Sequence, residues 1–421
     1  MQPISTTLLA DTATLTSDDT FIGGVSLREL AATYGTPLFV YDEATLRARC
    51  RSVASSFDDG VAFASKSFLC GAMARLAVEE GLCIDVATGG ELDLVLRSGV
   101  PASRVILHGN NKSRDELVRA LSVGVHRIVV DNFDEIALLR ELVSPEQPVN
   151  CLVRVTPGVE AHTHEFVRTG HEDTKFGFAV ASGAARRAIT ALQAIPGLTL
   201  HGVHAHIGSQ IFGTEGFVEA IGILAEFIAG DDFDELCIGG GLGVAYVAEE
   251  QAIPIEEWAT TVRTAVQAAG LGDLKLLAEP GRAIVAQAAL TLYAVGAIKP
   301  VTQRTYMAVD GGMSDNPRPV LYGSGYESFD ISQPLAERTQ PVRLVGKHCE
   351  SGDVLIDEAW LPASTAVGSI VATPVTGAYG YSMASTYNRV PRPAVVFVAD
   401  GQARLVLRRE TFDDLANLEV Q

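Results

Sequence analysis

The chain has 421 residues, a length that suits a barrel of about 250 residues plus a second domain. Its formal net charge of -19 and pI of about 4.9 would repel a polyanion, so we expect no nucleic-acid partner. The most apolar long segment, residues 284–298, has polar interruptions and is too short to span a membrane, so we expect no membrane partner.

The amino terminus and the cysteines indicate a cytoplasmic protein. No basic residue precedes the first short apolar stretch, and Asp11 follows it closely, unlike a secretory signal. The six cysteines form no C-x-x-C pair, which argues against a zinc ribbon or a disulfide framework. We expect most of them to be buried thiols, except Cys349, whose neighbours in "GKHCESGD" are polar or charged.

Strand-like and helix-like segments alternate along the first two thirds of the chain. The segment "TPLFVYD" predicts a first strand, and from about residue 44 to 285 short β-prone runs alternate with helix-prone runs. Eight strand candidates follow one another: Val61–Ala64, Cys83–Val86, Val105–His108, Arg127–Val130, Cys151–Val155, Leu200–His206, Glu235–Ile238 and Lys275–Glu279. Eight such units favour a closed barrel, although a doubly wound open sheet is also compatible with the alternation.

The pattern changes after Pro280. Runs such as "TYMAVDGG", "QPVRLVG", "DVLIDEAWL" and "AVVFVADGQARLVL" follow closely, with few helical patterns between them. We therefore predict an α/β protein with a (β/α)8 TIM-type barrel, residues 44–285, and a second, mostly antiparallel β domain. The β domain takes residues 1–43 and 286–421.

Lys66 is the one charged residue in "VAFASKSFLC", the segment that contains the first predicted barrel strand. A charged side chain at the end of a buried strand costs free energy unless it is paired or used. It could cap the strand and extend to water. It could instead be a Schiff-base lysine, whose amine attacks a carbonyl. The other strand ends decide between these interpretations.

Further polar residues follow strands six and seven. "HAHIGSQ" contains His204, His206 and Ser209, and Gly239–Gly243 offers backbone N–H groups suited to phosphate oxygens, although such a run can also be a simple turn. His204 and His206 alternate by two and could bind a metal. No further ligand set at the strand ends completes such a site in the sequence, so a histidine that stacks on an aromatic ligand fits better.

Glu279 ends the eighth strand, in "EPGR". It could form a simple salt bridge with Arg282. Alternatively, it keeps a pyridine nitrogen protonated while Arg282 binds an anion. A lysine, a ring-facing histidine, a phosphate loop and this carboxylate together describe a pyridoxal phosphate site with no metal.

At this point the chain resembles the diaminopimelate decarboxylases, pyridoxal-phosphate enzymes with an alanine-racemase-like barrel. The resemblance covers nearly the whole chain. It is carried, in order, by "FASKSF", "LHGNNKS", "HEDTKFGF", "HAHIGSQ", "GGGLG", "EPGR", "DGGMSDNPRPVLYG", "CESGD" and "GAYGYSMASTYN".

The resemblance implies a role for each matching residue. Lys66, His206 and Cys349 would be catalytic: Lys66 would carry the cofactor, His206 would stack on its ring, and Cys349 would donate a proton. The cofactor-binding residues would be Lys66, His206, Ser209, Gly240, Gly241, Glu279, Gly281, Arg282 and Tyr379. The substrate-binding residues would be Arg282, Arg318, Tyr322, Glu350 and Tyr379.

The activity implied is decarboxylation of meso-2,6-diaminopimelate to L-lysine and carbon dioxide, the last step of lysine biosynthesis. The alternatives are a decarboxylase of a related basic amino acid (ornithine, arginine, D-lysine or D-ornithine) and a non-catalytic regulatory homologue. The family also implies a homodimer in which the barrel of one subunit and the β domain of its neighbour share each active site.

Overall fold

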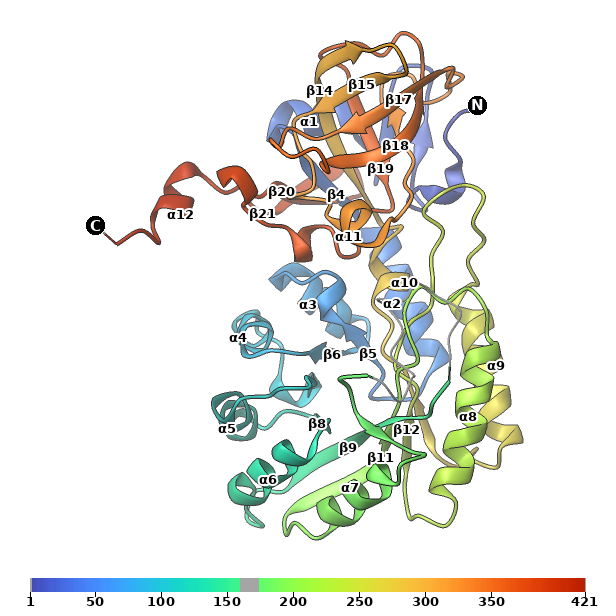
Figure 1. Cartoon of the computed structure of the whole chain (residues 1–421), viewed down its shortest axis with the longest axis vertical. Helices are drawn as coiled ribbons and strands as arrows, with labels where there is room; N and C mark the ends of the chain where they lie inside the picture. The colour runs from blue at the N-terminus through green and yellow to red at the C-terminus, as the bar shows by residue number, and fades with distance from the viewer. Residues whose placement is uncertain (1, 160–173, 421) are drawn as a thin grey trace. The chain divides into compact units, whose positions relative to one another are not determined.

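A computed structural model describes residues 2–159 and 174–420. The chain divides into two compact units (Figure 1). The barrel unit comprises Arg49–Gly243 and Ala252–Ala283. The β unit comprises Met1–Ala48, Val244–Gln251 and Ile284–Gln421. The short segment Val244–Gln251 thus belongs to the β unit although it follows a barrel strand in the sequence.

The barrel unit is built on eight parallel strands that follow one another in chain order. They are β5 (Ala62–Ala64), β6 (Cys83–Val86), β7 (Val105–Leu107), β8 (Arg127–Val130), β9 (Val149–Thr156), β11 (Leu198–His204), β12 (Glu235–Cys237) and β13 (Lys275–Leu277), while β10 (Phe178–Ala179) pairs with β9 alone. The Ala62 and Ala64 amides donate to the carbonyls of Ala278 (2.9 Å) and Pro280 (3.2 Å). These bonds join the last strand to the first, so the predicted barrel is confirmed and the open sheet is wrong.

Helices surround the strands of this unit (Figure 1). They are α2 (Glu43–Ser56), which leads in from the β unit, then α3 (Gly71–Glu79), α4 (Gly89–Arg97), α5 (Arg114–Val123), α6 (Phe133–Leu142), α7 (Ala184–Gln193), α8 (Glu215–Ile228) and α9 (Ile255–Ala268). The side chains of Thr88, Ser113 and Asn132 each accept a backbone N–H three residues on, which caps α4, α5 and α6. Such caps fix where each strand-to-helix loop ends.

The β unit contains a mixed sheet and a small three-stranded one. The larger sheet is formed by β4 (Leu38–Asp42), β14 (Ala289–Pro300), β15 (Thr305–Val309), β16 (Phe329–Asp330), β17 (Gln340–Val345), β18 (Val354–Leu361), β19 (Ile370–Pro374), β20 (Ala394–Ala399) and β21 (Gln402–Leu407). Its pairings are antiparallel except β15–β17 and β4–β20. The predicted second domain, mostly antiparallel, is therefore confirmed as a fold class.

The amino-terminal residues contribute to the β unit through several elements. β4 lies between β14 and β20, so the first strand predicted from "TPLFVYD" is a member of the larger sheet. The small sheet is β1 (Thr14–Leu15), β2 (Thr20–Ile22) and β3 (Val25–Ser26), and the short helices are α1 (Leu27–Tyr34), α10 (Arg282–Val285), α11 (Arg318–Tyr322) and α12 (Phe412–Ala416). Among the described helices, none is long and apolar enough to cross a membrane.

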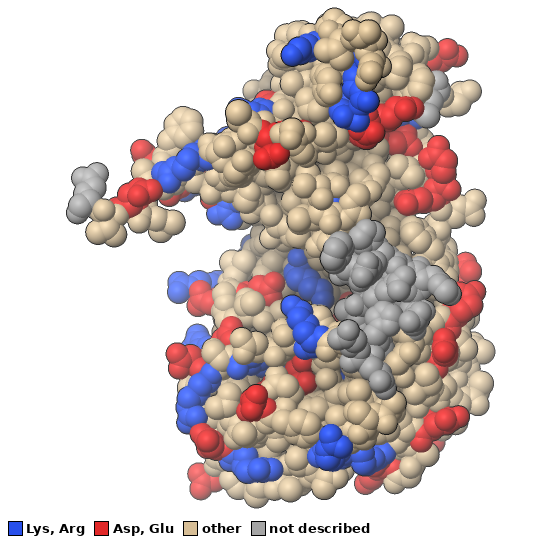
Figure 2. Space-filling view, in the orientation of Figure 1, with Lys and Arg blue, Asp and Glu red and all other residues tan. Residues whose placement is uncertain are grey.

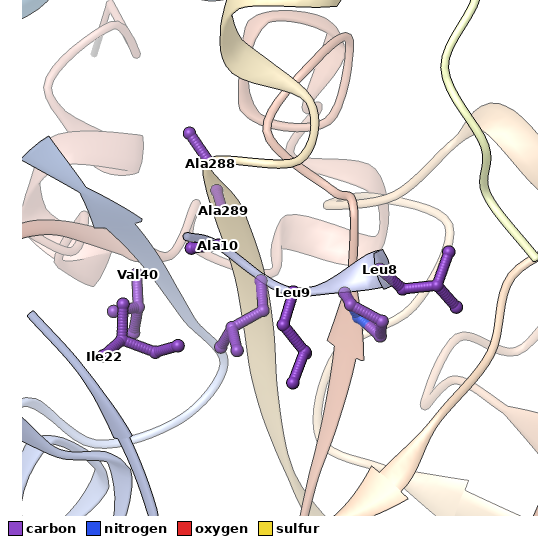
Figure 3. A pocket seen from close by; sticks show the side chains of 9 residues that line it. Leu8, Leu9, Ala10, Ile22, Val40, Ala288 and Ala289 are labelled. Carbon is purple, nitrogen blue, oxygen red and sulfur yellow. The ribbon is translucent and has the colours of Figure 1, made fainter. Parts of the chain in front are cut away.

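Two surface and packing features bear on where a site can lie. A small apolar pocket in the β unit is lined by Leu8, Leu9, Ala10, Ile22, Val40, Ala288, Ala289, Leu290 and Pro374 (Figure 3). Because none of these side chains is polar, the pocket offers no catalytic group.

Acidic and basic side chains are interspersed over the visible face of the barrel unit (Figure 2), with no large basic patch for a polyanion.

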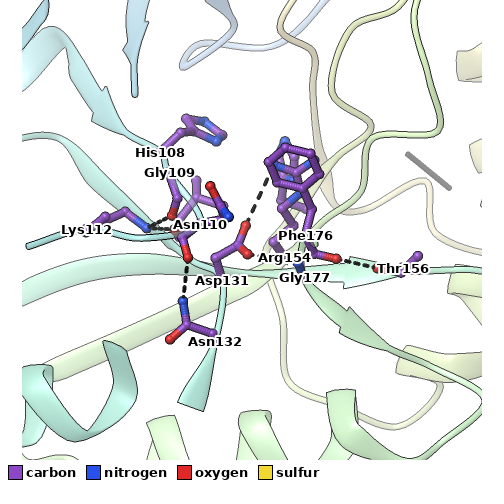
Figure 4. A network of polar contacts seen from close by, with 12 residues as sticks. His108, Gly109, Asn110, Lys112, Asp131, Asn132, Arg154, Thr156, Phe176 and Gly177 are labelled. Atoms are coloured by element: carbon purple, nitrogen blue, oxygen red, sulfur yellow. Dashed lines mark hydrogen bonds and ion pairs between the residues drawn. The ribbon is translucent and has the colours of Figure 1, made fainter. Parts of the chain in front are cut away.

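A buried ion pair in the barrel unit joins the loop before α5 to the first turn of α6. Lys112 Nζ lies 2.8 Å from Glu135 Oε1, and both side chains are 1% exposed. The same ammonium donates to the carbonyl of Gly109 at 2.8 Å (Figure 4) and to that of Val129 at 2.7 Å. Glu135 Oε2 accepts the Asp131 amide at 2.9 Å. Removing one partner of such a pair leaves an uncompensated buried charge.

We expect Glu135→Gln to lower the free energy of unfolding by about 3 kcal/mol, because the Lys112 ammonium loses its counter-charge. The matched control is Glu141→Gln, which breaks the exposed Arg114–Glu141 pair and should cost less than about 1 kcal/mol. Urea unfolding followed by circular dichroism measures both. Equal losses in the two variants would contradict the prediction.

Candidate active site

Lys66 lies at the carboxyl end of the first barrel strand. It is the middle residue of a 3-10 turn, Ser65–Ser67, that follows β5 directly. Its side chain is exposed, whereas both flanking serines are buried, and Ser67 Oγ donates to the Ala64 carbonyl at 2.8 Å. The turn therefore buries its two serines and leaves the lysine side chain accessible at the carboxyl end of the strand. Barrel enzymes carry out their chemistry at this end.

Glu279 follows the last strand and is held by two histidines. His108 Nε2 lies 2.9 Å from Glu279 Oε1, and His204 Nε2 lies 2.9 Å from Glu279 Oε2. All three side chains are buried. The simple Glu279–Arg282 salt bridge considered above is thus replaced by a carboxylate with one imidazole at each oxygen.

These neighbours determine the charge of the carboxylate. Burial by itself would raise the pKa of Glu279, but His108 and His204 hold that pKa well below its usual range. Asp85, in β6, lies 3.8 Å from His108 Nε2, and burial raises the pKa of its carboxyl. Glu279 is consequently an ionised carboxylate inside the end of the barrel.

The two histidines of "HAHIGSQ" have different partners. His204 bonds Glu279, whereas the His206 ring accepts the Gly240 amide on Nδ1 at 3.2 Å. Burial, followed by the positive charges of Lys66 and Arg154, holds the pKa of His206 well below its usual range, so the ring is neutral. A shared His204–His206 metal site is therefore not what the structure forms.

The glycine run approaches other backbone segments too closely for a side chain. A Cβ at Gly240 would lie 2.3 Å from the Glu279 carbonyl, and one at Gly241 would lie 2.3 Å from the Gly208 carbonyl. Gly241 also has a φ of +111°, which other residues rarely adopt. The loops after β11, β12 and β13 therefore meet with only backbone between them, and this cradle lies beside Ser209.

Ser209 and Arg282 meet from two different strand ends. Arg282 Nη2 donates to Ser209 Oγ at 3.0 Å, and the guanidinium is buried. Gly281, just before it, packs against the first strand end, where a Cβ would lie 2.8 Å from both the Ala64 carbonyl and Ser67 Oγ. A hydroxyl, a guanidinium and glycine backbone amides are donors that suit an anionic phosphate.

Other predicted residues belong to the β unit. Arg318 begins α11; its Nε donates to the Tyr326 hydroxyl and its Nη2 to Ser324 Oγ, both at 2.9 Å. Its guanidinium lies 4.6 Å from the ring centre of Tyr246 and 5.8 Å from that of Tyr322. Arg318 is thus buried and held rigidly by aromatic rings.

Cys349 and Glu350 lie in an exposed turn of the same unit. The Cys349 amide donates to Asn388 Oδ1 at 3.2 Å, and the Gly352 amide donates to Glu350 Oε1 at 3.1 Å. Cys349 is exposed and the other five cysteines are buried, which confirms the expectation from the sequence. Tyr379 has a φ of +58°, a strained backbone conformation that often marks functional positions.

Known proteins resemble this chain along nearly its whole length. Residues 43–286 match the family model "Pyridoxal-dependent decarboxylase, pyridoxal binding domain". The diaminopimelate decarboxylase of Mycobacterium tuberculosis is 48% identical over 95% of this chain and 94% of its own, and that of Bacillus subtilis is 45% identical over 95% and 94%. This chain belongs to the diaminopimelate decarboxylase family.

The fold of a solved structure agrees with this family. The crystal structure of diaminopimelate decarboxylase from M. jannaschii in complex with L-lysine has a TM-score of 0.90 and 29% identity, and the match covers 98% of each chain. Membership of the diaminopimelate decarboxylase family makes this chain a pyridoxal phosphate-dependent carboxy-lyase. Of the family motif "HEDTKFGF", the first three residues lie outside the described part of the chain.

The barrel residues fit pyridoxal 5'-phosphate. The cofactor needs an amine for its aldehyde, an anionic partner for its ring nitrogen and donors for its phosphate. Lys66 supplies the amine and Glu279 an ionised carboxylate, while the cradle at Gly240 and Gly241, which a Cβ would fill, lies beside the Ser209 hydroxyl.

The sequence alone did not identify His108 and Asp85 as members of this cluster. His108 was visible as the last residue of the predicted strand Val105–His108, within "LHGNNKS". Asp85 was visible as the one charged residue of the strand Cys83–Val86. A polar residue in or just after a buried barrel strand was therefore an available signal, but their partners depend on the closed barrel.

We expect Gly241→Ala to lose cofactor affinity by at least about tenfold, because its Cβ would overlap the Gly208 carbonyl and distort the cradle. The matched control is Gly222→Ala in α8, where the added Cβ meets nothing within 4 Å. Titration of the apoprotein with pyridoxal phosphate, followed by absorbance, measures both. Unchanged affinity in Gly241→Ala would show that the cradle does not bind the phosphate.

Proposed function

We propose that this chain decarboxylates meso-2,6-diaminopimelate to L-lysine and carbon dioxide, the last step of lysine biosynthesis. The observation that carries this proposal is the ionised Glu279 carboxylate at the carboxyl end of the barrel, in a chain 48% identical to a diaminopimelate decarboxylase. The lysine bound in the M. jannaschii structure supports an amino-acid product.

In this proposal the barrel residues bind the cofactor, within residues 44–285. Lys66 attaches it, the neutral His206 ring stacks on it, and Glu279 accepts the ring N–H. Its phosphate is bound by Ser209, Gly240, Gly241, Gly281 and Arg282, which offer a hydroxyl, backbone amides and a guanidinium. When bound, the pyridoxal ring accepts the electron pair left on Cα as carbon dioxide departs.

Residues of the β unit complete the chemistry. Cys349, whose thiol is exposed, donates the proton that replaces the carboxylate on Cα. Arg318, Tyr322 and Arg282 bind the distal carboxylate of the substrate, and Glu350 binds its distal ammonium. Tyr379 contacts both cofactor and substrate. Arg318 is suited to its role because Tyr326 and Tyr246 fix its guanidinium.

The proposed substrate residues discriminate between amino acids. Ornithine, arginine, D-lysine and D-ornithine lack a distal carboxylate, so they would offer no anionic group to the Arg282 and Arg318 guanidinium groups. This favours diaminopimelate over those substrates. A non-catalytic regulatory homologue would not require Lys66, Cys349 and Glu279 together.

We further propose a homodimer in the cytoplasm. The support for the dimer is the family resemblance, in which the barrel of one subunit and the β domain of its neighbour form each site. The support for the compartment is the biosynthetic role of the relatives together with the absence of C-x-x-C pairs in the sequence.

We expect Lys66→Ala to lower carbon dioxide release from diaminopimelate by about 10³-fold or more, because no other amine stands at that strand end. Borohydride treatment should fix the cofactor on the Lys66 peptide of the native protein and on no peptide of the variant. The control is Lys275→Ala, at the opposite end of a barrel strand, which should remain active. Full turnover by Lys66→Ala would contradict the proposed role.

A panel of amino acids tests the substrate separately. The native protein should release carbon dioxide from diaminopimelate and not from ornithine, arginine or their D-isomers. Faster release from any of these would refute diaminopimelate as the substrate while leaving the cofactor site intact.

We expect two inactive variants, Lys66→Ala and Cys349→Ala, to complement each other when their subunits exchange. About half of the dimers become mixed, and each mixed dimer has one site with both residues, so roughly a quarter of all sites recover. Carbon dioxide release is the measurement, with exchange verified by native mass spectrometry. A verified mixture as inactive as its parents would contradict the shared site.

A further inference from the structure

The carboxylate of Glu279 is hydrogen-bonded by histidines from two other strands of the barrel. His108 follows β7 and His204 ends β11, and each places its Nε2 2.9 Å from a different carboxylate oxygen. The two imidazole rings lie edge to face, with centres 5.1 Å apart. One hydrogen bond at each oxygen fixes the plane of the carboxylate.

The two histidines have different surroundings on their other sides. His108 Nε2 lies 3.8 Å from Asp85 Oδ1 as well as 2.9 Å from Glu279 Oε1, so this nitrogen faces two buried carboxyl groups. His204 has no second acidic neighbour within ion-pair distance among the described residues. Its Nδ1 is buried and has no hydrogen-bond partner there, so a proton on that nitrogen would be unsatisfied.

We propose that His108 and His204 are positioning residues with unequal charge: His108 is an imidazolium whose Nε2 faces Glu279 and Asp85, and His204 is a neutral imidazole that donates through Nε2. The proposal rests on the proposed pairing of Glu279 with the cofactor ring nitrogen and explains how that pairing is maintained. Neither histidine needs to touch substrate or cofactor.

The charges of the cluster follow from this assignment. The His108 imidazolium keeps Glu279 ionised, and the neutral His204 adds a hydrogen bond without a second positive charge, so the carboxylate stays available to a protonated ring nitrogen. If both histidines were cationic, their two positive charges would exceed the single negative charge of Glu279 and would oppose a proton on the ring nitrogen. In a buried site, where charges are poorly screened, such a difference decides whether a proton stays on the ring.

The directions of the pKa shifts agree with the geometry. Burial opposes charge on both rings, but Asp85 and Glu279 together raise the pKa of His108. Burial lowers the pKa of His204, and Glu279 by itself does not offset this effect. Arg154, the other charged group that acts on both rings, opposes their protonation, and it lies 3.7 Å from Asp131.

A metal ion is the competing interpretation of this cluster. The ligand-type atoms of His108, His204 and Glu279 lie within 4.8 Å of one another, as metal ligands would. The hydrogen bonds favour protons over a metal, because each Nε2 lies at hydrogen-bond distance from a separate oxygen. A metal would instead require lone pairs on both nitrogens to point at one ion.

Matched glutamine variants separate charge from hydrogen bonding. His204→Gln keeps an N–H donor and remains neutral, so it should lower kcat by no more than about tenfold. His108→Gln also keeps a donor but loses the positive charge, so kcat should fall about 100-fold with little change in KM. Equal effects of the two substitutions would overturn the proposal.

The readout that does not depend on turnover is the cofactor itself. Holoprotein reconstituted with pyridoxal phosphate labelled with nitrogen-15 in the ring should show a protonated ring nitrogen by solid-state NMR in the native protein and in His204→Gln. In His108→Gln the proton should move from the ring nitrogen to Glu279, because the carboxyl then lacks the positive charge that holds its pKa low. A ring nitrogen that stays protonated in His108→Gln would overturn the proposal.

Nitrogen-15 labelling of histidine in the native holoprotein provides a test that needs no folded His108 variant. Of the two rings, one should carry protons on both nitrogens and the other, identified by its loss in His204→Gln, should have an unprotonated Nδ1. Two neutral rings, or a stoichiometric metal lost on His204→Gln, would refute the assignment. If the ring nitrogen of the cofactor is protonated but the protein does not decarboxylate diaminopimelate, the proposed substrate is refuted and this inference still holds.

Discussion

The site depends on keeping one carboxylate charged inside the barrel. Burial favours the neutral form of Glu279, so an ionised side chain there requires partners that compensate the lost hydration. His108 and His204 provide them, one at each oxygen. A neutral Glu279 could not stabilise a proton on a pyridine nitrogen, and the electron-accepting power of the cofactor would fall with it.

Closure of the barrel is what makes this arrangement possible. Glu279, His108 and His204 come from the ends of β13, β7 and β11, separated by up to 171 residues in sequence. Parallel strands in a closed ring direct all their carboxyl ends to the same rim. Backbone bonds from Ala62 and Ala64 to Ala278 and Pro280 close that ring, and they also fix Lys66 after the first strand and Glu279 after the last.

The glycine cradle and the β unit solve different problems. The cradle needs backbone amides with no side chain in the way, and contacts of 2.3 Å at the hypothetical Cβ positions of Gly240 and Gly241 explain why glycine stands there. The β unit instead fixes the long side chain of Arg318, since aromatic rings and hydroxyl groups surround its guanidinium. In the proposed function the cradle binds the cofactor phosphate, whereas Arg318 binds the distal carboxylate of diaminopimelate.

The sequence by itself determined the eight strands, the barrel class and the residues that carry the family resemblance, because hydrophobic periodicity and short motifs are local properties. It also singled out Cys349 from its polar neighbours, and that thiol is the exposed one. It left open whether Glu279 bonds Arg282, and it gave His108 and Asp85 no role. Only the tertiary structure decided those partners, since a hydrogen bond between residues on distant strands depends on which strand ends the closed barrel brings within 3 Å.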